Sequence, residues 1–593
     1  MADHPPCART AVPWFWLALV LGAAAVYLFG LGSPYAPTNG DEMVYIHIAR
    51  LTAQSGHWLP LVSDLANMRN TKPPLLFWQA VLAGDWGQQW SLLALRLPSV
   101  AYTFMTTALL AWLTLRISGR LRSACIAAAL YLLFFSTFRY GRVYLTSAPE
   151  TFWFALPLFW LLWLRLPHPA RADIPPEAGL GVYTLMGMSM GIGMAYKSFA
   201  LLAPASATLW LALLWTTPAW NWRSTLRTSA GLTWSALLAL GVFGLWFVLD
   251  PDPGAVWREF VVGENAGKLS GKQGYWHAAF FGDYPLWTQL FAYPINAGLL
   301  VFTVLGFLLS SLRGAWRLPT YATLGAPQRV LLVWLVVWLV AFSIPSQREA
   351  RYVIPAMPAL AMLMALDWDR LGRIWFWLTL AVLAPALVML ARVAWVMGDL
   401  QMANTAQTTM TLIAACAGLT CVAAGFHSKE RCRAATLCAC LAVYAAFGCM
   451  VAPLSTPEAG YSTAVLRHMQ GQRIAVPNGF PGQYERYEFV LPGNHLVPYD
   501  AEGRNTGAFS PDMPGAERLP YLLNQFDAAV WYQDRLDQFQ PSCLPQCTLL
   551  GWRWHVKSRH KSGEVTLTNL WYPQQWLFRK EWLVTKSAGS HGK

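Results

Sequence analysis

The chain has 593 residues, of which 55% are hydrophobic and 12% charged, and its mean hydropathy is +0.35. This balance excludes an ordinary soluble protein, in which about a quarter of the residues are charged. The formal charge of +13 raises the class of nucleic-acid-binding proteins, but the basic residues are dispersed among short loops rather than gathered on one face. Anionic lipid headgroups and anionic substrates are therefore the expected partners, and no nucleic acid is expected.

Apolar runs of about 17–25 residues recur as far as residue 452, and each is long enough to cross a bilayer. The first run resembles a signal peptide, but it is long and lacks a small-residue cleavage site, so it is interpreted as a retained span. The sequence predicts a polytopic α-helical membrane protein with about thirteen transmembrane helices. The spans are expected at 13–32, 97–115, 123–138, 150–166, 179–196, 199–216, 229–249, 287–310, 329–345, 352–366, 373–391, 408–426 and 434–452.

Every second loop between these spans is basic, and the positive-inside rule places such loops in the cytoplasm. Their basic residues are Arg116, Arg120, Arg122, Arg165, Arg171, Arg223, Arg227, Arg313, Arg317, Arg329, Arg370, Arg373, Lys429, Arg431 and Arg433. The N-terminus is then inside, and the long first loop 33–96 and the tail 453–593 are outside. The sequence predicts a transmembrane domain at 1–452 and a separate soluble domain at 453–593.

The tail alternates short strand-like runs at 473–477, 528–532 and 548–550 with helical stretches at 463–471 and 482–491. This alternation predicts a small α/β domain. It has no Gly-rich phosphate loop, so a packing or substrate-gating role is favoured. Cys543 and Cys547 are close enough for a local disulfide in an oxidising compartment. The other eight cysteines are expected to be free, and no Cys/His zinc spacing occurs.

Two adjacent acids, Asp41 and Glu42, follow the first span, with Tyr45 one turn further along. Carboxylates at a membrane boundary are costly unless they meet water, a cation or a substrate. Acids also favour helix N-termini, so solvated acids that cap a short helix are the alternative. From this stretch alone, both interpretations stay open.

The same loop carries Lys72 before Pro73 and Pro74, followed by an aromatic helix. A lysine held rigidly in this way suits a phosphate at the membrane surface because its charge is compact. A lysine that snorkels to the interface is the alternative.

Later outer loops add further cations. Arg139 and Arg142 are three residues apart, so they can share a helix face and pair with an anion. Glu150 stands at the start of the next span, where a helix N-terminus favours an acid. Lys197 interrupts an apolar stretch, which marks it as a candidate functional residue. Arg348, Arg351 and Tyr352 lie in a later loop on the same face.

The series Asp41-Glu42 with Tyr45, Lys72-Pro73-Pro74, Lys197 and Arg351-Tyr352 resembles the GT-C integral-membrane glycosyltransferases. Within them it is similar to the aminoarabinose:lipid A transferase family, which is related to the protein O-mannosyltransferases. The resemblance spans the whole membrane part in motif order.

The resemblance implies an inverting glycosyltransferase at the periplasmic face of a bacterial inner membrane, with the soluble domain in the periplasm. A sugar, 4-amino-4-deoxy-L-arabinose or another amino sugar, would move from undecaprenyl phosphate to a lipid A phosphate. Lipopolysaccharide modified in this way confers polymyxin resistance. The candidate catalytic acids are Asp41, Glu42 and Glu150. The candidate residues for the donor phosphate and substrate are Tyr45, Lys72, Arg139, Arg142, Lys197, Arg348, Arg351 and Tyr352.

Two departures from the family pattern matter. Family members often have an acid before the lysine of the Lys-Pro motif, where this chain has Thr71, and His277 alone does not restore a metal site. The second-loop acid of the family is replaced by Ser147, and the nearest acid is Glu150. No metal ligand and no cofactor are therefore assigned, a divalent metal stays open as the weaker alternative, and so does a different sugar or acceptor.

Other classes fit less well. A transporter favours polar groups at the membrane midplane and symmetric halves, whereas here the polar residues gather at one face and no repeat occurs. An undecaprenyl-linked glycan ligase or a protein O-glycosyltransferase would use the same class of donor. Ligases usually depend on a late outer loop, whereas the paired acids here lie in the first. A monomer is expected.

Overall fold

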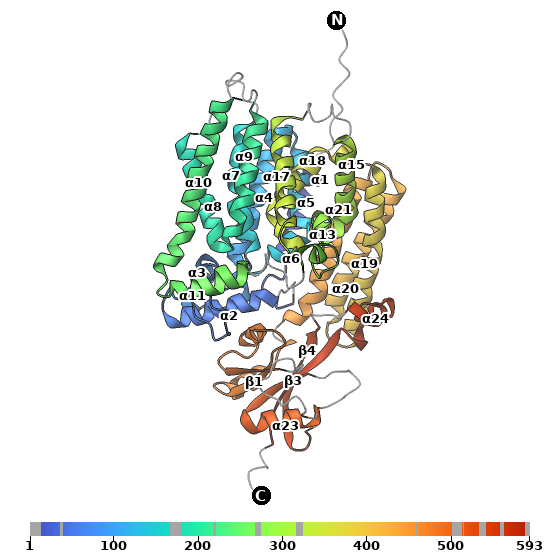
Figure 1. Ribbon diagram of the computed structural model, residues 1–593. Coiled ribbons are helices and arrows are strands. Elements are labelled where there is room, and N and C mark those ends of the chain that lie inside the picture. Colours follow the sequence, from blue (N-terminus) through green and yellow to red (C-terminus); the bar gives the residue numbers. More distant parts are fainter. Residues whose placement is uncertain are drawn as a thin grey trace.

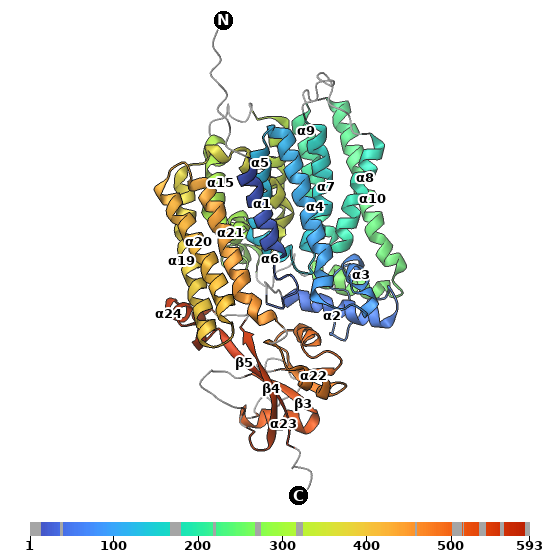
Figure 2. The same ribbon diagram turned by 180° about the vertical axis from the view of Figure 1, so that it is seen from behind.

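The computed structural model describes residues 13–35, 40–166, 179–217, 221–266, 274–315, 324–456, 459–500, 513, 515–532, 541, 543–557 and 562–587. Long helices stand side by side in a bundle, and a small domain with a β-sheet sits at one end of it (Figures 1 and 2). The protein is thus a multi-pass α-helical membrane protein with a C-terminal sheet domain.

Each span expected from the sequence coincides with at least one helix of the bundle. The bundle helices are α1 (Pro13–Leu28), α4 (Leu92–Ser118), α5 (Leu121–Leu133), α6 (Phe135–Tyr140), α7 (Ser147–Leu164), α8 (Leu180–Tyr196), α9 (Leu202–Thr216), α10 (Trp222–Leu249), α13 (Leu286–Leu290), α14 (Ala292–Ala297), α15 (Val301–Ala315), α17 (Ala326–Ser343), α18 (Met357–Leu366), α19 (Arg373–Asp399), α20 (Thr405–His427) and α21 (Cys432–Val451).

The count of thirteen transmembrane helices is not confirmed. Among the described residues, eight helices are both long and apolar enough to cross a membrane, and several expected spans are shorter or interrupted. The span expected at 123–138 breaks at Phe134, whose extended backbone separates α5 from α6. The one at 287–310 is interrupted at Gly298, which has a φ of +58°. Uniform hydropathy does not reveal such breaks.

The surfaces of the bundle helices follow from their surroundings. Leu237, Leu245 and Val248 of α10 are more than half exposed, as lipid-facing side chains are in a protein described without its membrane. On the inner face, α8 approaches α10 closely at Gly187, where a Cβ atom would lie 2.6 Å from the Ser235 carbonyl oxygen. Small residues allow such close helix packing in membranes.

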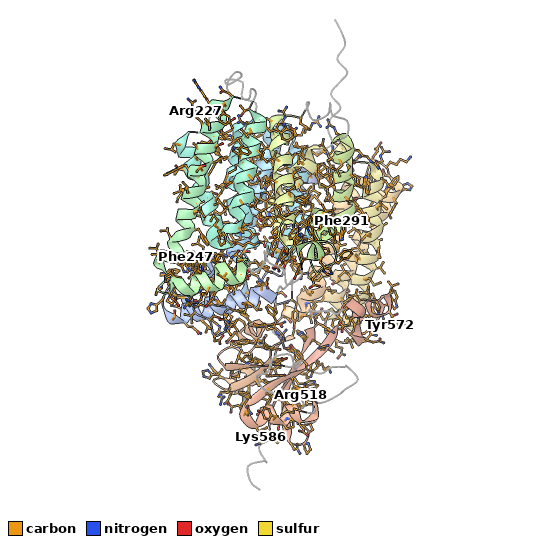
Figure 3. All side chains as sticks on the ribbon, viewed as in Figure 1. Arg227, Phe247, Phe291, Arg518, Tyr572 and Lys586 are labelled. Atoms are coloured by element: carbon orange, nitrogen blue, oxygen red, sulfur yellow. A yellow bond between two sulfur atoms is a disulfide. The ribbon has the colours of Figure 1, made fainter. Side chains whose placement is uncertain are left out.

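Two short helices cross the end of the bundle that faces the sheet domain (Figure 1). They are α2 (Gly40–Ser55) and α3 (Pro74–Ala83). The helix α3 begins at Pro74 because proline has a suitable φ for a first helical residue and needs no amide partner there. Arg227, which the sequence places in a basic loop, lies in α10, and it stands at the opposite end of the bundle from Lys586 of the sheet domain (Figure 3).

The C-terminal sheet has five strands in the order β2-β1-β3-β5-β4. The strands are β1 (Arg473–Pro477), β2 (His495–Tyr499), β3 (Ala528–Tyr532), β4 (Cys547–Val556) and β5 (Phe578–Lys586). The central β1 pairs in parallel with β2 and β3, whereas β5 is antiparallel to β3 and β4. The mixed sheet, with α22 (Thr463–Met469) and α23 (Gly515–Gln525), is the expected α/β type.

Alternating side chains bury both faces of this sheet. Ile474 and Val476 pack into one core with α22, and Ala475 between them packs into the other with α23. The second core also contains Cys543 and Cys547, which form a disulfide. The stretch at 482–491 is helical as expected, but Gln483–Phe489 is a 3₁₀ helix.

Candidate functional site

The first acid of the pair, Asp41, lies in the opening turn of α2, where the helix dipole favours a carboxylate. Its Oδ2 atom accepts a hydrogen bond from Nη1 of Arg351 at 2.9 Å, and the two side chains are 31% and 38% exposed. Arg351 also forms an ion pair with Glu349. The structure therefore joins residues 310 positions apart into one partly solvated group.

Lys72 lies at the start of α3 beside Tyr45. Its Nζ atom is 2.7 Å from Oε1 of Glu264 and donates to the Thr71 carbonyl oxygen at 2.8 Å. The ammonium is 5.6 Å from the centroid of the Tyr45 ring. Pro73 and Pro74 fix the backbone here, so the lysine is held in one orientation at the bundle end.

A third ion pair joins α7 to the end of α8. Nζ of Lys197 lies 2.7 Å from a carboxylate oxygen of Glu150, which is fully buried. The same ammonium is 5.9 Å from the Tyr352 ring centroid, next to Arg351 in the chain. A buried pair of this kind is tolerated because each charge offsets the other.

These three pairs form one group, here called the Asp41 cluster. Its members are Asp41, Tyr45, Lys72, Glu150, Lys197, Glu264, Glu349, Arg351 and Tyr352. The charges of Asp41, Glu264, Arg351 and Glu150 act on the Tyr45 side chain. Burial raises its pKa, and the carboxylates of Asp41, Glu264 and Glu150 raise it further against the opposing charge of Arg351. The phenol therefore stays protonated and can donate a hydrogen bond.

The second acid, Glu42, lies outside this cluster and is fully buried in protein. Its two oxygens accept hydrogen bonds from Nε and Nη2 of Arg96 at 2.7 and 2.8 Å, and both side chains are 0% exposed. Oε1 also accepts from the Tyr144 amide at 2.9 Å. Arg96 uses Nη1 to donate to the carbonyl oxygens of Leu31 and Ser33. The arrangement anchors α2 to α4.

Two of the predicted phosphate ligands are also buried against protein. Arg142 donates to the Phe29 carbonyl oxygen at 2.5 Å, and its guanidinium lies 4.5 Å from the Phe138 ring centroid. Arg348 donates to the Ser343 carbonyl oxygen at 2.8 Å. Because both guanidinium groups point into protein, the structure does not bring them into the Asp41 cluster.

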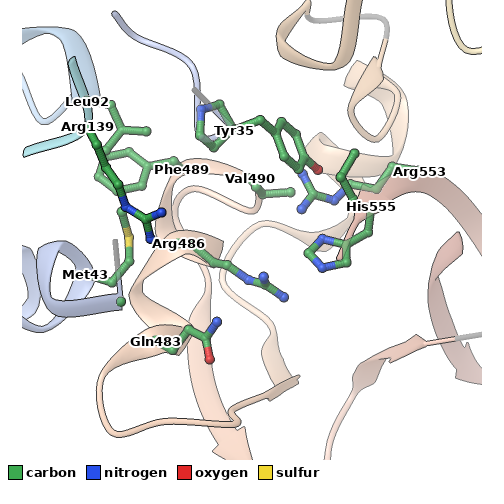
Figure 4. A pocket seen from close by; sticks show the side chains of 13 residues that line it. Tyr35, Met43, Leu92, Arg139, Gln483, Arg486, Phe489, Val490, Arg553 and His555 are labelled. Atoms are coloured by element: carbon green, nitrogen blue, oxygen red, sulfur yellow. The ribbon is translucent and has the colours of Figure 1, made fainter. Parts of the chain in front are cut away.

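Arg139 lines a cavity of about 240 Å³ between the bundle and the sheet domain (Figure 4). We call it the arginine cavity and define it by Tyr35, Arg139, Gln483, Arg486, Arg553 and His555. Gly40 and Met43 of α2 also line it. The cavity therefore begins one residue away from Asp41.

The sheet-domain wall of this cavity is held by Glu581. Arg553 donates to Glu581 at 2.5 Å, and Nη2 of Arg486 lies 3.2 Å from the same carboxylate. Burial alone would raise the pKa of Glu581, but the arginines hold it at about 2, so the group is ionised. Burial and the arginines lower the pKa of His555 to about 3, so its imidazole is neutral.

Next to the cavity, α2 is tied to the sheet domain by a second polar network. His47 lies 2.8 Å from Glu485 and 2.6 Å from Asp64, and Arg50 donates to Glu485 at 2.6 Å. Burial would lower the pKa of His47, but the two carboxylates outweigh it and raise this pKa to about 9. Gly482, with a φ of +73°, lets the backbones meet, since a Cβ atom there would lie 3.2 Å from Val44 Cα.

A large apolar groove of about 1420 Å³ runs along the other side of α3. Leu75, Trp78, Gln79 and Leu82, at the spacing of one helix face, line it together with aromatic residues of α4, α7 and α8. Both polar atoms of the Gln79 amide are buried and have no hydrogen-bond partner. The groove suits a long hydrocarbon chain that enters from the membrane.

Several residues of these sites were missed by sequence reasoning. Arg96 stands just outside the expected span 97–115, and an arginine at a membrane boundary is itself a signal of a buried carboxylate partner. Glu264, Glu485 and Arg486 belong to no recognisable motif. Glu264 pairs with Lys72, which is 192 positions away, and Glu485 pairs with Arg50, which is 435 positions away. Within the described ranges, no three His, Cys, Asp or Glu residues are grouped as a metal site would need.

Known proteins resemble this chain in sequence and in fold. Residues 37–253 match the family described as dolichyl-phosphate-mannose-protein mannosyltransferase. An undecaprenyl phosphate-alpha-4-amino-4-deoxy-L-arabinose arabinosyl transferase of Pectobacterium carotovorum is 27% identical over 375 residues, which cover 58% of this chain and 60% of the relative. One from Sodalis glossinidius is 29% identical, covering 55% and 54%. The chain thus spans a little over half the length of these relatives.

Among solved structures, ArnT from Cupriavidus metallidurans bound to undecaprenyl phosphate matches with a TM-score of 0.58 at 16% identity. The match covers 98% of this chain and 99% of that one. The same protein in the apo state gives a TM-score of 0.54 at 17% identity. At these identities the likeness establishes the fold, including the sheet domain at the end of the bundle.

Proposed function

Because the chain is similar to aminoarabinose transferases in sequence and shares the fold of ArnT, we propose that it is a GT-C integral-membrane glycosyltransferase that transfers a sugar from undecaprenyl phosphate to a lipid-linked acceptor. The proposed sugar is 4-amino-4-deoxy-L-arabinose or a related amino sugar, and the proposed acceptor is a lipid A phosphate. The site would face the periplasm from a bacterial inner membrane. The protein would act as a monomer.

The single observation that carries this proposal is the Asp41 cluster. It combines a partly exposed carboxylate, a rigidly held lysine and a protonated tyrosine at one end of a membrane bundle. A lipid phosphate that approaches from the membrane would meet Lys72 and Arg351, which are suited to stabilise negative charge. The apolar groove along α3 begins three residues after Lys72 and would hold the polyprenyl chain.

In the proposed reaction, the bond between the anomeric carbon and the oxygen of undecaprenyl phosphate breaks, and an acceptor oxygen forms the new bond from the opposite face. An acceptor phosphate monoester is already ionised, so no proton has to be removed from it. The charge is balanced because the acceptor loses one negative charge and undecaprenyl phosphate gains one. Asp41 would then orient the reactants and stabilise positive charge that develops on the sugar.

The cations of the cluster would act on the leaving group. Lys72 is paired with Glu264 in the structure described here, so an arriving donor phosphate has to take the place of that carboxylate at the ammonium. Tyr45 can donate its phenol hydrogen to a phosphate oxygen because it stays protonated. Glu150 would act through Lys197 by holding its ammonium toward Tyr352 and Arg351.

The test is mass spectrometry of lipid A and core oligosaccharide from cells with and without the gene. An amino sugar on a lipid A phosphate that disappears on deletion and returns with the wild-type gene is the expected result. Restoration by the wild type but not by Asp41→Asn would tie the product to the cluster. Unchanged lipid A and core in the deletion strain would refute this acceptor.

A further inference from the structure

We propose that the arginine cavity binds the phosphate of the acceptor, and that the sheet domain thereby takes part in acceptor selection. This inference rests on the proposed function, since it assigns the acceptor to a site beside Asp41. Its chemistry is that of a phosphate monoester on an amphiphilic lipid, a group that the acceptor carries before the transfer and undecaprenyl phosphate carries after it.

The charge of the cavity is unbalanced. Arg139, Arg486 and Arg553 bring three guanidinium groups to its walls, and the carboxylate of Glu581 behind them offsets one. None of the described lining residues is acidic. A phosphate monoester carries a charge of about −1.5 to −2 at neutral pH, which matches the remaining excess.

Two of the arginines that line the cavity have hydrogen-bond donors that the described residues leave unsatisfied. Among the described residues Arg139 has no carboxylate partner; its guanidinium lies 5.6 Å from the ring centroids of Phe135 and Tyr140. The buried Nε atoms of Arg139 and Arg486 have no hydrogen-bond acceptor in the described structure. Buried unpaired donors are costly, and arginine forks bind phosphate oxygens well, so an anionic ligand would satisfy them.

The shape and position of the cavity favour the acceptor over the donor. Leu92, Met43, Phe489 and Val490 form an apolar part of the wall next to the arginines, as an amphiphilic ligand requires (Figure 4). The volume of about 240 Å³ is below that of pockets for drug-sized ligands, so it suits a headgroup fragment. Gly40 lines the cavity, whereas Asp41 faces Arg351 and the donor cations. Asp41 thus lies between the arginine cavity and the cations proposed to bind the donor phosphate.

The experiment uses the full-length protein in nanodiscs and measures binding by native mass spectrometry. The ligands are diphosphorylated lipid A, the same lipid A without phosphates, and undecaprenyl phosphate. The variants are Gln483→Glu, which adds a negative charge to the cavity, and Arg139→Gln, which removes a positive one. Arg473→Gln, an exposed arginine at the start of β1, is the matched control.

We expect both cavity variants to weaken binding of diphosphorylated lipid A at least tenfold, with undecaprenyl phosphate and dephosphorylated lipid A bound as by the wild type. The transfer assay should then show a raised KM for the acceptor. Unchanged lipid A binding in folded variants would overturn the inference, and so would a selective loss of undecaprenyl phosphate, which would assign the cavity to the donor. If the wild type transfers no sugar but still binds lipid A through these residues, the proposed function fails while the anion site stands.

Discussion

The two neighbouring acids at the start of α2 have opposite surroundings. Glu42 is wholly buried, and Arg96 and a backbone amide satisfy its oxygens. Asp41 is 31% exposed and shares Arg351 with Glu349. A carboxylate that is saturated by protein donors holds the fold, whereas one with a shared partner and open surface can meet a substrate. Adjacent positions in a motif therefore need not share a role.

The largest effect is expected from Asp41→Asn, which tests whether the partly exposed acid is needed for transfer. The substitution keeps the shape of the side chain but removes its charge, and Arg351 retains Glu349, so the fold should persist. We expect transfer to fall by about 10²–10³-fold, the range for the loss of one group that stabilises transition-state charge. The measurement is turnover of purified protein at saturating donor and acceptor. Near-normal turnover would remove Asp41 from the mechanism.

The complementary change is Arg96→Leu, which leaves the Glu42 carboxylate buried without its partner. Breaking a buried ion pair in this way costs roughly 3–5 kcal/mol. We expect a sharp loss of folded protein in the membrane and a lower unfolding temperature, with the remaining folded fraction partly active. Arg122→Leu, which removes an exposed pair with Asp369 at the other end of the bundle, is the control and should change little.

Within the Asp41 cluster, Lys72→Ala tests the donor phosphate. We expect a rise of about 10- to 100-fold in the donor KM or an equivalent loss of kcat/KM, since one charge-assisted phosphate contact disappears. Lys557→Ala is a matched control, because Lys557 pairs with Glu564 in the sheet domain at similar exposure. A change in protein yield without a change in donor use would identify Lys72 as an interfacial lysine.

The smallest expected effect concerns pH and the link between α2 and the sheet domain. His47 has a pKa raised to about 9, so its contribution is complete below about 6.5 and is lost as the pH rises through 9. The protection factors of residues 483–489, corrected for the intrinsic pH dependence of amide exchange, should therefore fall between these pH values. His47→Phe should flatten that fall. Equal protection factors across this range in the wild type would contradict the assignment.

Much of the fold could be predicted from the sequence because apolar length and strand alternation are local signals. The strands at 473–477 and 528–532 were placed correctly for that reason. The break at Phe134 and the 3₁₀ geometry of Gln483–Phe489 depend on packing against other elements, so they were not visible.

The site was predictable to a smaller extent. The motif residues Asp41, Lys72 and Arg351 do come together at one end of the bundle. The separation of Glu42 from Asp41 could not be predicted, because consecutive residues on a helix point in different directions and the partner Arg96 lies 54 positions away. Nor could the sheet domain be connected to the site, since Glu485 meets His47 and Arg50 of the first loop only in the folded molecule.

The helix α2, which lies across the end of the bundle, connects the bundle to the sheet domain. Asp41 stands near one of its ends, and His47 and Arg50, about 9–14 Å further along at 1.5 Å per residue, are held by Glu485. A protein shortened to the bundle alone would leave Arg50 without its carboxylate partners, His47 with Asp64 alone, and the cavity wall open. The sheet domain is thus part of the structure that holds α2 in place, and a bundle transplanted without it would lose the support of the candidate site.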